Sequence, residues 1–145
     1  MKANADFPTI NAKNPEGIND MGSPYKVLLV DDSMFVRKQL SQILTSEGFD
    51  IVGEAGDGVE GLEMYKNLAP NVDLVTMDIT MPRMDGLTCL EKIVEYDSNA
   101  KIIMISALGK EDLVKKALIT GAKNYIVKPL DRKKVLERIV SVLKG

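Results

Sequence analysis

The segment KVLLVDDSMFVRKQLSQIL, residues 26–44, carries the pattern that decides the fold. It opens on a nearly continuous apolar run, KVLLVD, which is typical of a strand buried on both faces of a parallel sheet. Ser33 can then cap a helix. The apolar side chains of that helix fall on one stripe: Val36, Leu40, Ile43 and Leu44. The segment therefore predicts a buried strand followed by a helix that covers it and ends near Gly48.

The same strand and helix pattern recurs along the rest of the chain. The further strands are expected at FDIVGEA (49–55), DLVTMD (73–78), KIIMIS (101–106) and NYIVK (124–128). The helices that follow them are expected at 58–69, 86–96, 110–120 and 131–143. Buried strands that alternate with amphipathic helices predict an α/β protein whose parallel sheet is covered on both faces. Right-handed crossovers leave few topologies, and we predict a flavodoxin-like, doubly wound, five-stranded sheet of order 2-1-3-4-5 with five helices.

The length and composition of the chain fit one folded domain with a short tail. The chain has 145 residues, and residues 1–24 contain three prolines, four asparagines and no apolar periodicity. We therefore expect a flexible N-terminal tail at 1–24 and a folded domain at 25–145. A net charge of −2 does not favour nucleic-acid binding, and no apolar run is long enough for membrane insertion. No secretory signal and only one cysteine indicate a cytoplasmic protein.

Polar residues stand where the expected strands end. The first strand ends in Asp31 and Asp32, the third in Asp78, the fourth in Ser106 and the fifth in Lys128. In doubly wound sheets, ligands bind at the carboxyl ends of the strands, beside the point where the strand order reverses. Any one of these residues is more simply explained as a solvated turn residue. Together they predict a functional site at one edge of the sheet.

Three neighbouring carboxylates indicate a metal site. Two like charges 4 Å apart repel by roughly 4 kcal/mol at an effective dielectric constant of 20, and one lysine cannot balance three of them. The chain has no histidine, so the ligands are oxygens, which favours Mg²⁺. A cation, a lysine and a hydroxyl around a carboxylate suit phosphoryl transfer, with the carboxylate as the nucleophile.

Four motifs, each at a strand end, resemble one protein family. They are VDDS (30–33), MDITMPRMDG (77–86), ISA (105–107) and YIVKP (125–129). In this order and spacing they are similar to the receiver domains of response regulators across residues 25–145, and most similar to stand-alone CheY-like chemotaxis receivers. The strand order predicted above is also that of this family, so the two inferences are not independent.

The resemblance implies a role for each site residue. Asp78 would accept the phosphoryl group. Mg²⁺ would be held directly by Asp32 and Asp78, through water by Asp31, and by the backbone carbonyl of Thr80. The family often has asparagine at the position of Thr80, whose side chain affects access of the hydrolytic water.

The remaining implied roles concern the response to phosphorylation. Lys128 would pair with the phosphoryl group, Ser106 would hydrogen-bond to it, and Tyr125 would be the aromatic switch that turns inward when Ser106 moves. Leu108 is apolar, whereas some relatives carry a polar residue at this position.

The partners implied are a histidine kinase, of the CheA type, and an effector protein such as the flagellar motor switch. The expected effector surface is basic and spans the last two helices and the strand between them: Lys115, Lys116, Lys123, Arg132 and Lys133. Self-catalysed phosphotransfer and autodephosphorylation would be the only enzymatic activities.

Three other hypotheses are weaker. An aspartate-nucleophile phosphatase would carry a second aspartate where this chain has Thr80, together with a cap. A receiver-like adaptor that is never phosphorylated would be expected to have lost a site residue. Gly56, Gly58 and Gly61 spell the dinucleotide motif G-x-G-x-x-G, but after the second strand rather than the first, so they are better explained as turn glycines.

Overall fold

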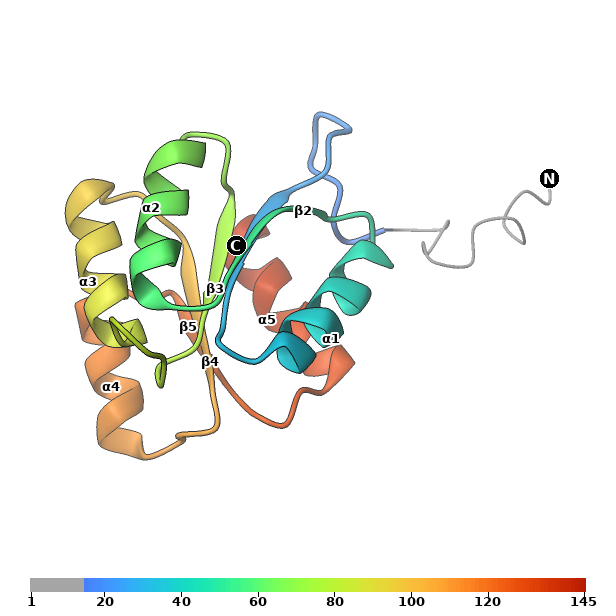
Figure 1. Ribbon diagram of the computed structural model, residues 1–145. Coiled ribbons are helices and arrows are strands. Elements are labelled where there is room, and N and C mark those ends of the chain that lie inside the picture. The colour runs from blue at the N-terminus through green and yellow to red at the C-terminus, as the bar shows by residue number, and fades with distance from the viewer. Residues whose placement is uncertain (1–14) are drawn as a thin grey trace, which may run out of the picture.

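The computed structural model describes residues 15–145 and shows a parallel sheet between two layers of helices (Figure 1). The strands are β1 (Lys26–Val30), β2 (Asp50–Ala55), β3 (Leu74–Met77), β4 (Ile102–Ser106) and β5 (Asn124–Val127). The helices are α1 (Met34–Thr45), α2 (Gly58–Leu68), α3 (Gly86–Tyr96), α4 (Glu111–Thr120) and α5 (Arg132–Lys144). The strand order is β2-β1-β3-β4-β5 with every pairing parallel, which confirms the predicted fold.

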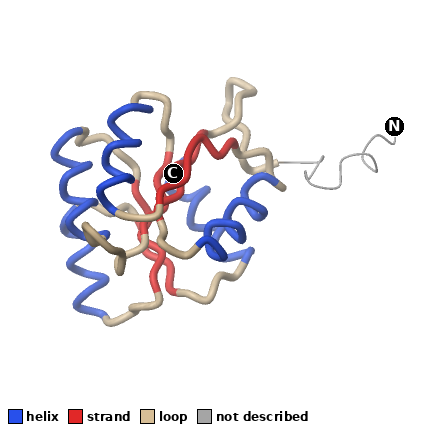
Figure 2. Tube along the Cα trace, viewed as in Figure 1, coloured by secondary structure: helices blue, strands red, loops and turns tan. Residues whose placement is uncertain are grey.

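The sheet is buried on both faces because alternate residues of each strand point to opposite layers. In β1, Leu28 and Val30 join the core beneath α2, α3 and α4, whereas Val27 and Leu29 pack beneath α1 and α5. Figure 2 shows the strands in red enclosed by helices in blue. Within residues 15–145, none of the helices combines the length and apolar character that a membrane span needs.

Short polar side chains fix where the helices begin. Ser33 accepts a hydrogen bond from the Val36 amide at the start of α1. Asp57, Asp85 and Asp131 cap α2, α3 and α5 in the same way. Each cap satisfies an amide that has no partner within its helix. The caps of α1, α2 and α5 lie within four residues of the preceding strand, so they also define short loops at the carboxyl edge of the sheet, whereas α4 begins without a side-chain cap.

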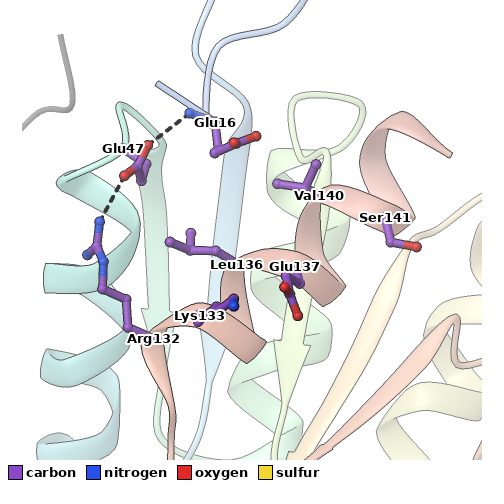
Figure 3. Close-up of a pocket in the computed structure, with 8 residues that line it drawn as sticks. All are labelled: Glu16, Glu47, Arg132, Lys133, Leu136, Glu137, Val140 and Ser141. Atoms are coloured by element: carbon purple, nitrogen blue, oxygen red, sulfur yellow. Dashed lines mark hydrogen bonds and ion pairs between the residues drawn. The ribbon is translucent and has the colours of Figure 1, made fainter. Parts of the chain in front are cut away.

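Residues 15–24 differ from the flexible tail expected at 1–24, since they pack on the domain. The Gly17 amide donates to the Glu47 carbonyl at 2.8 Å, and the Tyr25 amide donates to the Gly17 carbonyl at 2.8 Å. The buried Glu47 carboxylate accepts the Glu16 amide at 3.0 Å and the Arg132 guanidinium at 2.8 Å (Figure 3). The ordered fold therefore extends N-terminally past residue 25, and the rest of the expected tail, residues 1–14, lies outside the described residues.

The glycines of the G-x-G-x-x-G motif have a packing explanation. A Cβ atom on Gly61 would lie 2.8 Å from Cγ1 of Val30, so α2 can approach β1 only if this residue has no side chain. At Gly56 the nearest atom, on the Arg37 side chain, would be 3.8 Å away, which is ordinary contact distance. The close contact between α2 and β1 therefore explains why a glycine stands at position 61 without any nucleotide-binding role.

We predict that Gly61→Ala lowers the free energy of unfolding by about 1–3 kcal/mol, because the added methyl group forces α2 away from Val30. Gly56→Ala is the matched control from the same motif and should change stability by less than about 0.5 kcal/mol. Urea denaturation followed by circular dichroism measures both. Equal effects of the two substitutions would contradict this explanation of the motif.

Candidate functional site

Three carboxylates meet at the carboxyl ends of β1 and β3. Val30 pairs with Met77 in the parallel register, so Asp31 and Asp78, the residues that follow, emerge side by side. Asp31, Asp32 and Asp78 each offer a carboxylate oxygen, and these oxygens lie within 4.8 Å of one another. Asp31 and Asp78 are only 2% and 6% exposed, whereas Asp32 is exposed. The cluster therefore has a buried floor and one side open to solvent.

Lys128 brings a positive charge to this cluster from the end of β5. Its Nζ atom lies 3.0 Å from Oδ2 of Asp31 and 3.5 Å from Oδ2 of Asp78. The Lys128 amide also donates to the Ser106 carbonyl at 2.9 Å, which fixes the backbone from which the side chain extends. Three negative charges and one positive charge leave two negative charges unbalanced when all four groups are ionised. The site thus favours a cation beyond the lysine.

Burial and crowding change the acidity of Asp78. Desolvation raises the pKa of the Asp78 carboxyl group, and the Asp31 charge raises it further, with a smaller contribution from Asp32. The Lys128 ammonium and the Ile79 amide oppose this rise in pKa. The Ile79 amide donates to Oδ1 of Asp78 at 2.8 Å, while Oδ2 is the atom that faces Lys128. The two oxygens of Asp78 are therefore distinct, with Oδ2 turned toward the positive charge.

Ser106 and Tyr125 are linked through one residue of the β4–α4 loop. Ser106 is buried at the end of β4, and its hydroxyl oxygen accepts the Leu108 amide at 3.1 Å. The Tyr125 ring is buried, and its hydroxyl group donates to the Leu108 carbonyl. The Tyr125 side chain is therefore in an inward position in this structure, with Leu108 held from both sides.

The structure brings together most of the residues predicted from the sequence. Asp31, Asp32, Asp78 and Lys128 form one cluster, with Ser106 at the end of the neighbouring strand. Thr80 is exposed in the loop after β3, and a metal-binding role for its carbonyl stays a prediction.

Sequence reasoning missed Arg37, whose guanidinium donates to the Asp31 carbonyl and to Glu54. Arg37 lies one helical turn after the cap Ser33, a spacing that returns its side chain to the loop before the helix. This spacing is the signal that could have identified it.

The donor set fits a hard divalent cation. Mg²⁺ takes carboxylate oxygens and keeps several waters, and the open side at Asp32 leaves room for them. Softer ligands are not offered here, since the chain has no histidine. The buried thiol of Cys89 instead donates to the Gly58 carbonyl, and burial raises its pKa to about 12.

Comparison with known proteins identifies the class that this fold and site define. The model of the response regulator receiver domain matches residues 27–140. The chain belongs to this family, whose members are signalling proteins rather than metabolic enzymes.

Within the family, the chain is similar to the chemotaxis receivers. It is 69% identical to the chemotaxis protein CheY of Treponema pallidum, over 99% of this chain and all of the relative. It is 47% identical to CheY of Bacillus subtilis, over 82% of this chain and 98% of the relative. The CheY chain of a CheX–CheY–BeF₃–Mg²⁺ complex from Borrelia burgdorferi has 63% identity and a TM-score of 0.88, over 90% of this chain and 98% of that one. The chain is therefore a CheY-like receiver of chemotaxis two-component signalling.

We predict that Asp78→Asn raises the melting temperature in the presence of a chelator at neutral pH, because it removes a buried charge next to Asp31. A gain of about 1 kcal/mol corresponds to roughly 3 °C for a domain of this size. The folded-state pKa of Asp78 is raised, so the gain should be complete above that pKa and disappear as the pH falls through it toward the ordinary value of 3.8.

Asp50→Asn, at an exposed aspartate at the opposite end of the sheet, is the control and should leave the melting temperature unchanged. Calorimetric scans at several pH values provide the measurement. An Asp78→Asn protein that melts below the unsubstituted protein in chelator would contradict this account of the site.

Proposed function

We propose that this protein accepts a phosphoryl group on Asp78 from the phosphohistidine of a kinase, and that the modification changes which protein it binds. The observation that supports this proposal best is the position of Oδ2 of Asp78. This atom faces Lys128 at 3.5 Å at the edge of an acidic cluster that is suited to a divalent cation. A nucleophilic oxygen beside two sources of positive charge is what phosphoryl transfer requires.

The chemistry follows from the contacts of Asp78. An oxygen of its carboxylate forms the new O–P bond as the N–P bond of the phosphohistidine breaks, and the electron pair of that bond returns to the imidazole. Lys128 neutralises charge on the transferred group, and the Ser106 hydroxyl can donate a hydrogen bond to it. When held by Asp32, Asp78 and the Thr80 carbonyl, and through water by Asp31, Mg²⁺ would supply the remaining positive charge. Transfer and later hydrolysis would be self-catalysed.

The protein partners are proposed from the relatives. The Borrelia burgdorferi relative forms a complex with CheX, BeF₃ and Mg²⁺, which supports Mg²⁺ as the metal here. We propose a CheA-type histidine kinase as the phosphoryl donor and the flagellar motor switch as an effector, both in the cytoplasm. The receiver domain would comprise residues 25–145, with residues 15–24 packed on it.

The surface of α4 and β5 is the proposed binding site for the effector. Ile119 is 86% exposed, and Leu118 and Val127 are about half exposed, so this surface presents apolar side chains among its lysines. Ser106 and Tyr125 reach it through Leu108, a residue of the loop that leads into α4.

Arg132, expected on the same surface, instead binds Ser46 and Glu47 beside α1. The Arg132 guanidinium is half exposed, but its charge is paired with the Glu47 carboxylate, so it offers less free positive charge to an effector than the lysines do. The basic character of the proposed effector surface therefore comes mainly from four exposed lysines: Lys115, Lys116, Lys123 and Lys133.

We predict that acetyl phosphate and Mg²⁺ together add a single phosphoryl group to the intact protein, because Asp78 is the proposed acceptor and its Oδ2 lies 3.5 Å from Lys128. Intact-mass spectrometry gives the number of groups added. Asp78→Asn should remain unmodified, and Asp50→Asn should be modified like the unsubstituted protein. Equal modification of the Asp78→Asn protein would refute the assignment of the acceptor.

We also predict that phosphorylation strengthens binding of a motor-switch peptide roughly 5- to 150-fold, which is the usual range of coupling between two sites. A Lys115→Glu/Lys123→Glu protein should bind the peptide weakly in both states, and its affinity should depend less on salt. Fluorescence anisotropy with a labelled peptide measures each affinity. The same affinity for all forms would place the effector surface elsewhere.

A further inference from the structure

The β2–α2 turn, taken here as residues 54–58 so that it includes the end of β2 and the first residue of α2, contacts both loops that carry the acidic site. One loop follows β1 and contains Asp31 and Asp32, and the other follows β3 and runs from Asp78 to α3. The turn itself provides none of the carboxylates of the cluster. It can therefore affect the site only through its contacts with the two loops.

The contact with the first loop is made by Arg37. Its Nε atom donates to Glu54 at 3.0 Å, and its Nη1 atom donates to the carbonyl oxygen of Asp31. The Arg37 side chain is only 16% exposed and its bond to the Asp31 carbonyl is partly buried, whereas the Glu54 carboxylate is 46% exposed. One rigid guanidinium therefore joins the start of the turn to the backbone of a site residue. A lysine keeps the charge but cannot make both bonds in this fixed geometry.

The contact with the second loop combines an ion pair and close packing. Arg83 donates from Nε at 3.1 Å and from Nη2 at 3.3 Å to the two carboxylate oxygens of Asp57. The backbone of Arg83 has a φ of 67°, a conformation that costs free energy in a residue other than glycine. A Cβ atom on Gly58 would lie 2.2 Å from the Met84 carbonyl oxygen, so the loop touches the turn directly at this glycine.

We infer that the β2–α2 turn positions the two loops at the separation that a divalent cation needs, and that Arg37 is the main positioning residue. This inference rests on the proposed function, in which Mg²⁺ binds the acidic cluster. Without such support the mutual repulsion of Asp31, Asp32 and Asp78 would drive the loops apart. Cation binding would then have to bring the loops together again, and affinity would fall. The inference gives Gly58, a glycine of the apparent dinucleotide motif, a role in the site.

Two simpler explanations make different predictions. If Arg37 acts only through its positive charge, Arg37→Lys should bind Mg²⁺ as well as the unsubstituted protein does. If the turn only stabilises the fold, its variants should lose stability equally with and without Mg²⁺. A positioning role instead lowers the Mg²⁺ affinity even when the charge is kept, and it reduces the stabilisation that Mg²⁺ provides.

The experiment is a calorimetric titration of MgCl₂ into the folded full-length protein and three variants. Arg37→Lys should weaken Mg²⁺ binding about tenfold, the lower end of the range for residues that orient metal ligands. Asp57→Asn keeps the helix cap and removes the charge that holds Arg83, so its affinity should fall by about two- to fivefold, as for an exposed ion pair. Arg132→Gln is the control, since it breaks an ion pair of the same type with Glu47, which belongs neither to the cluster nor to its two loops, and its Mg²⁺ affinity should not change.

Melting temperatures with and without MgCl₂ give the second readout. The rise in melting temperature on adding Mg²⁺ should be smaller for Arg37→Lys than for Arg132→Gln. Unchanged affinity and an unchanged rise for Arg37→Lys and Asp57→Asn would overturn the inference while leaving the proposed function intact. No Mg²⁺ binding by the unsubstituted protein would overturn both. If Arg37→Lys fails to fold, Asp57→Asn alone decides the outcome.

Discussion

The crowding of carboxylates at the carboxyl ends of β1 and β3 is the constraint on which the rest of this structure depends. Parallel pairing of Val30 with Met77 makes Asp31 and Asp78 neighbours, and both are buried. A folded protein with this arrangement keeps unbalanced negative charge in a partly buried site, at a cost in stability. Three features of the site follow from this cost. Lys128 contacts both carboxylates, the pKa of Asp78 is raised, and the site is suited to the proposed cation.

The same crowding explains how a chemical change at Asp78 can alter the structure at the α4 surface. On the proposed function, phosphorylation adds negative charge where Lys128 is already shared with Asp31. Lys128 and the Ser106 hydroxyl would then turn toward the new group, and Ser106 could no longer hold the Leu108 amide in its present geometry. Tyr125 binds the Leu108 carbonyl, so it lies next in the chain of contacts that leads to the α4 surface.

The sequence predicted the architecture because its signals are local. Apolar strands, helical stripes and caps such as Ser33 are readable within a few residues, and the strand order then brings Asp31 and Asp78 together. What it did not predict depends on contacts between distant residues. The packing of residues 15–24 relies on Glu47, and Arg132 reaches that carboxylate from 85 positions along the chain. The contact of Arg37 with Glu54 was missed for a related reason, since Glu54 lies 17 positions along the chain, on β2.

The central claim is that repulsion among these carboxylates is real and is relieved by a divalent cation. It is tested most directly by measuring the pKa of the Asp78 carboxyl group by carbon-detected NMR, first in chelator and then with saturating Mg²⁺. The account predicts a pKa above the ordinary value of 3.8 in chelator and a clear fall when Mg²⁺ is added. An ordinary pKa in chelator that does not respond to Mg²⁺ would contradict it.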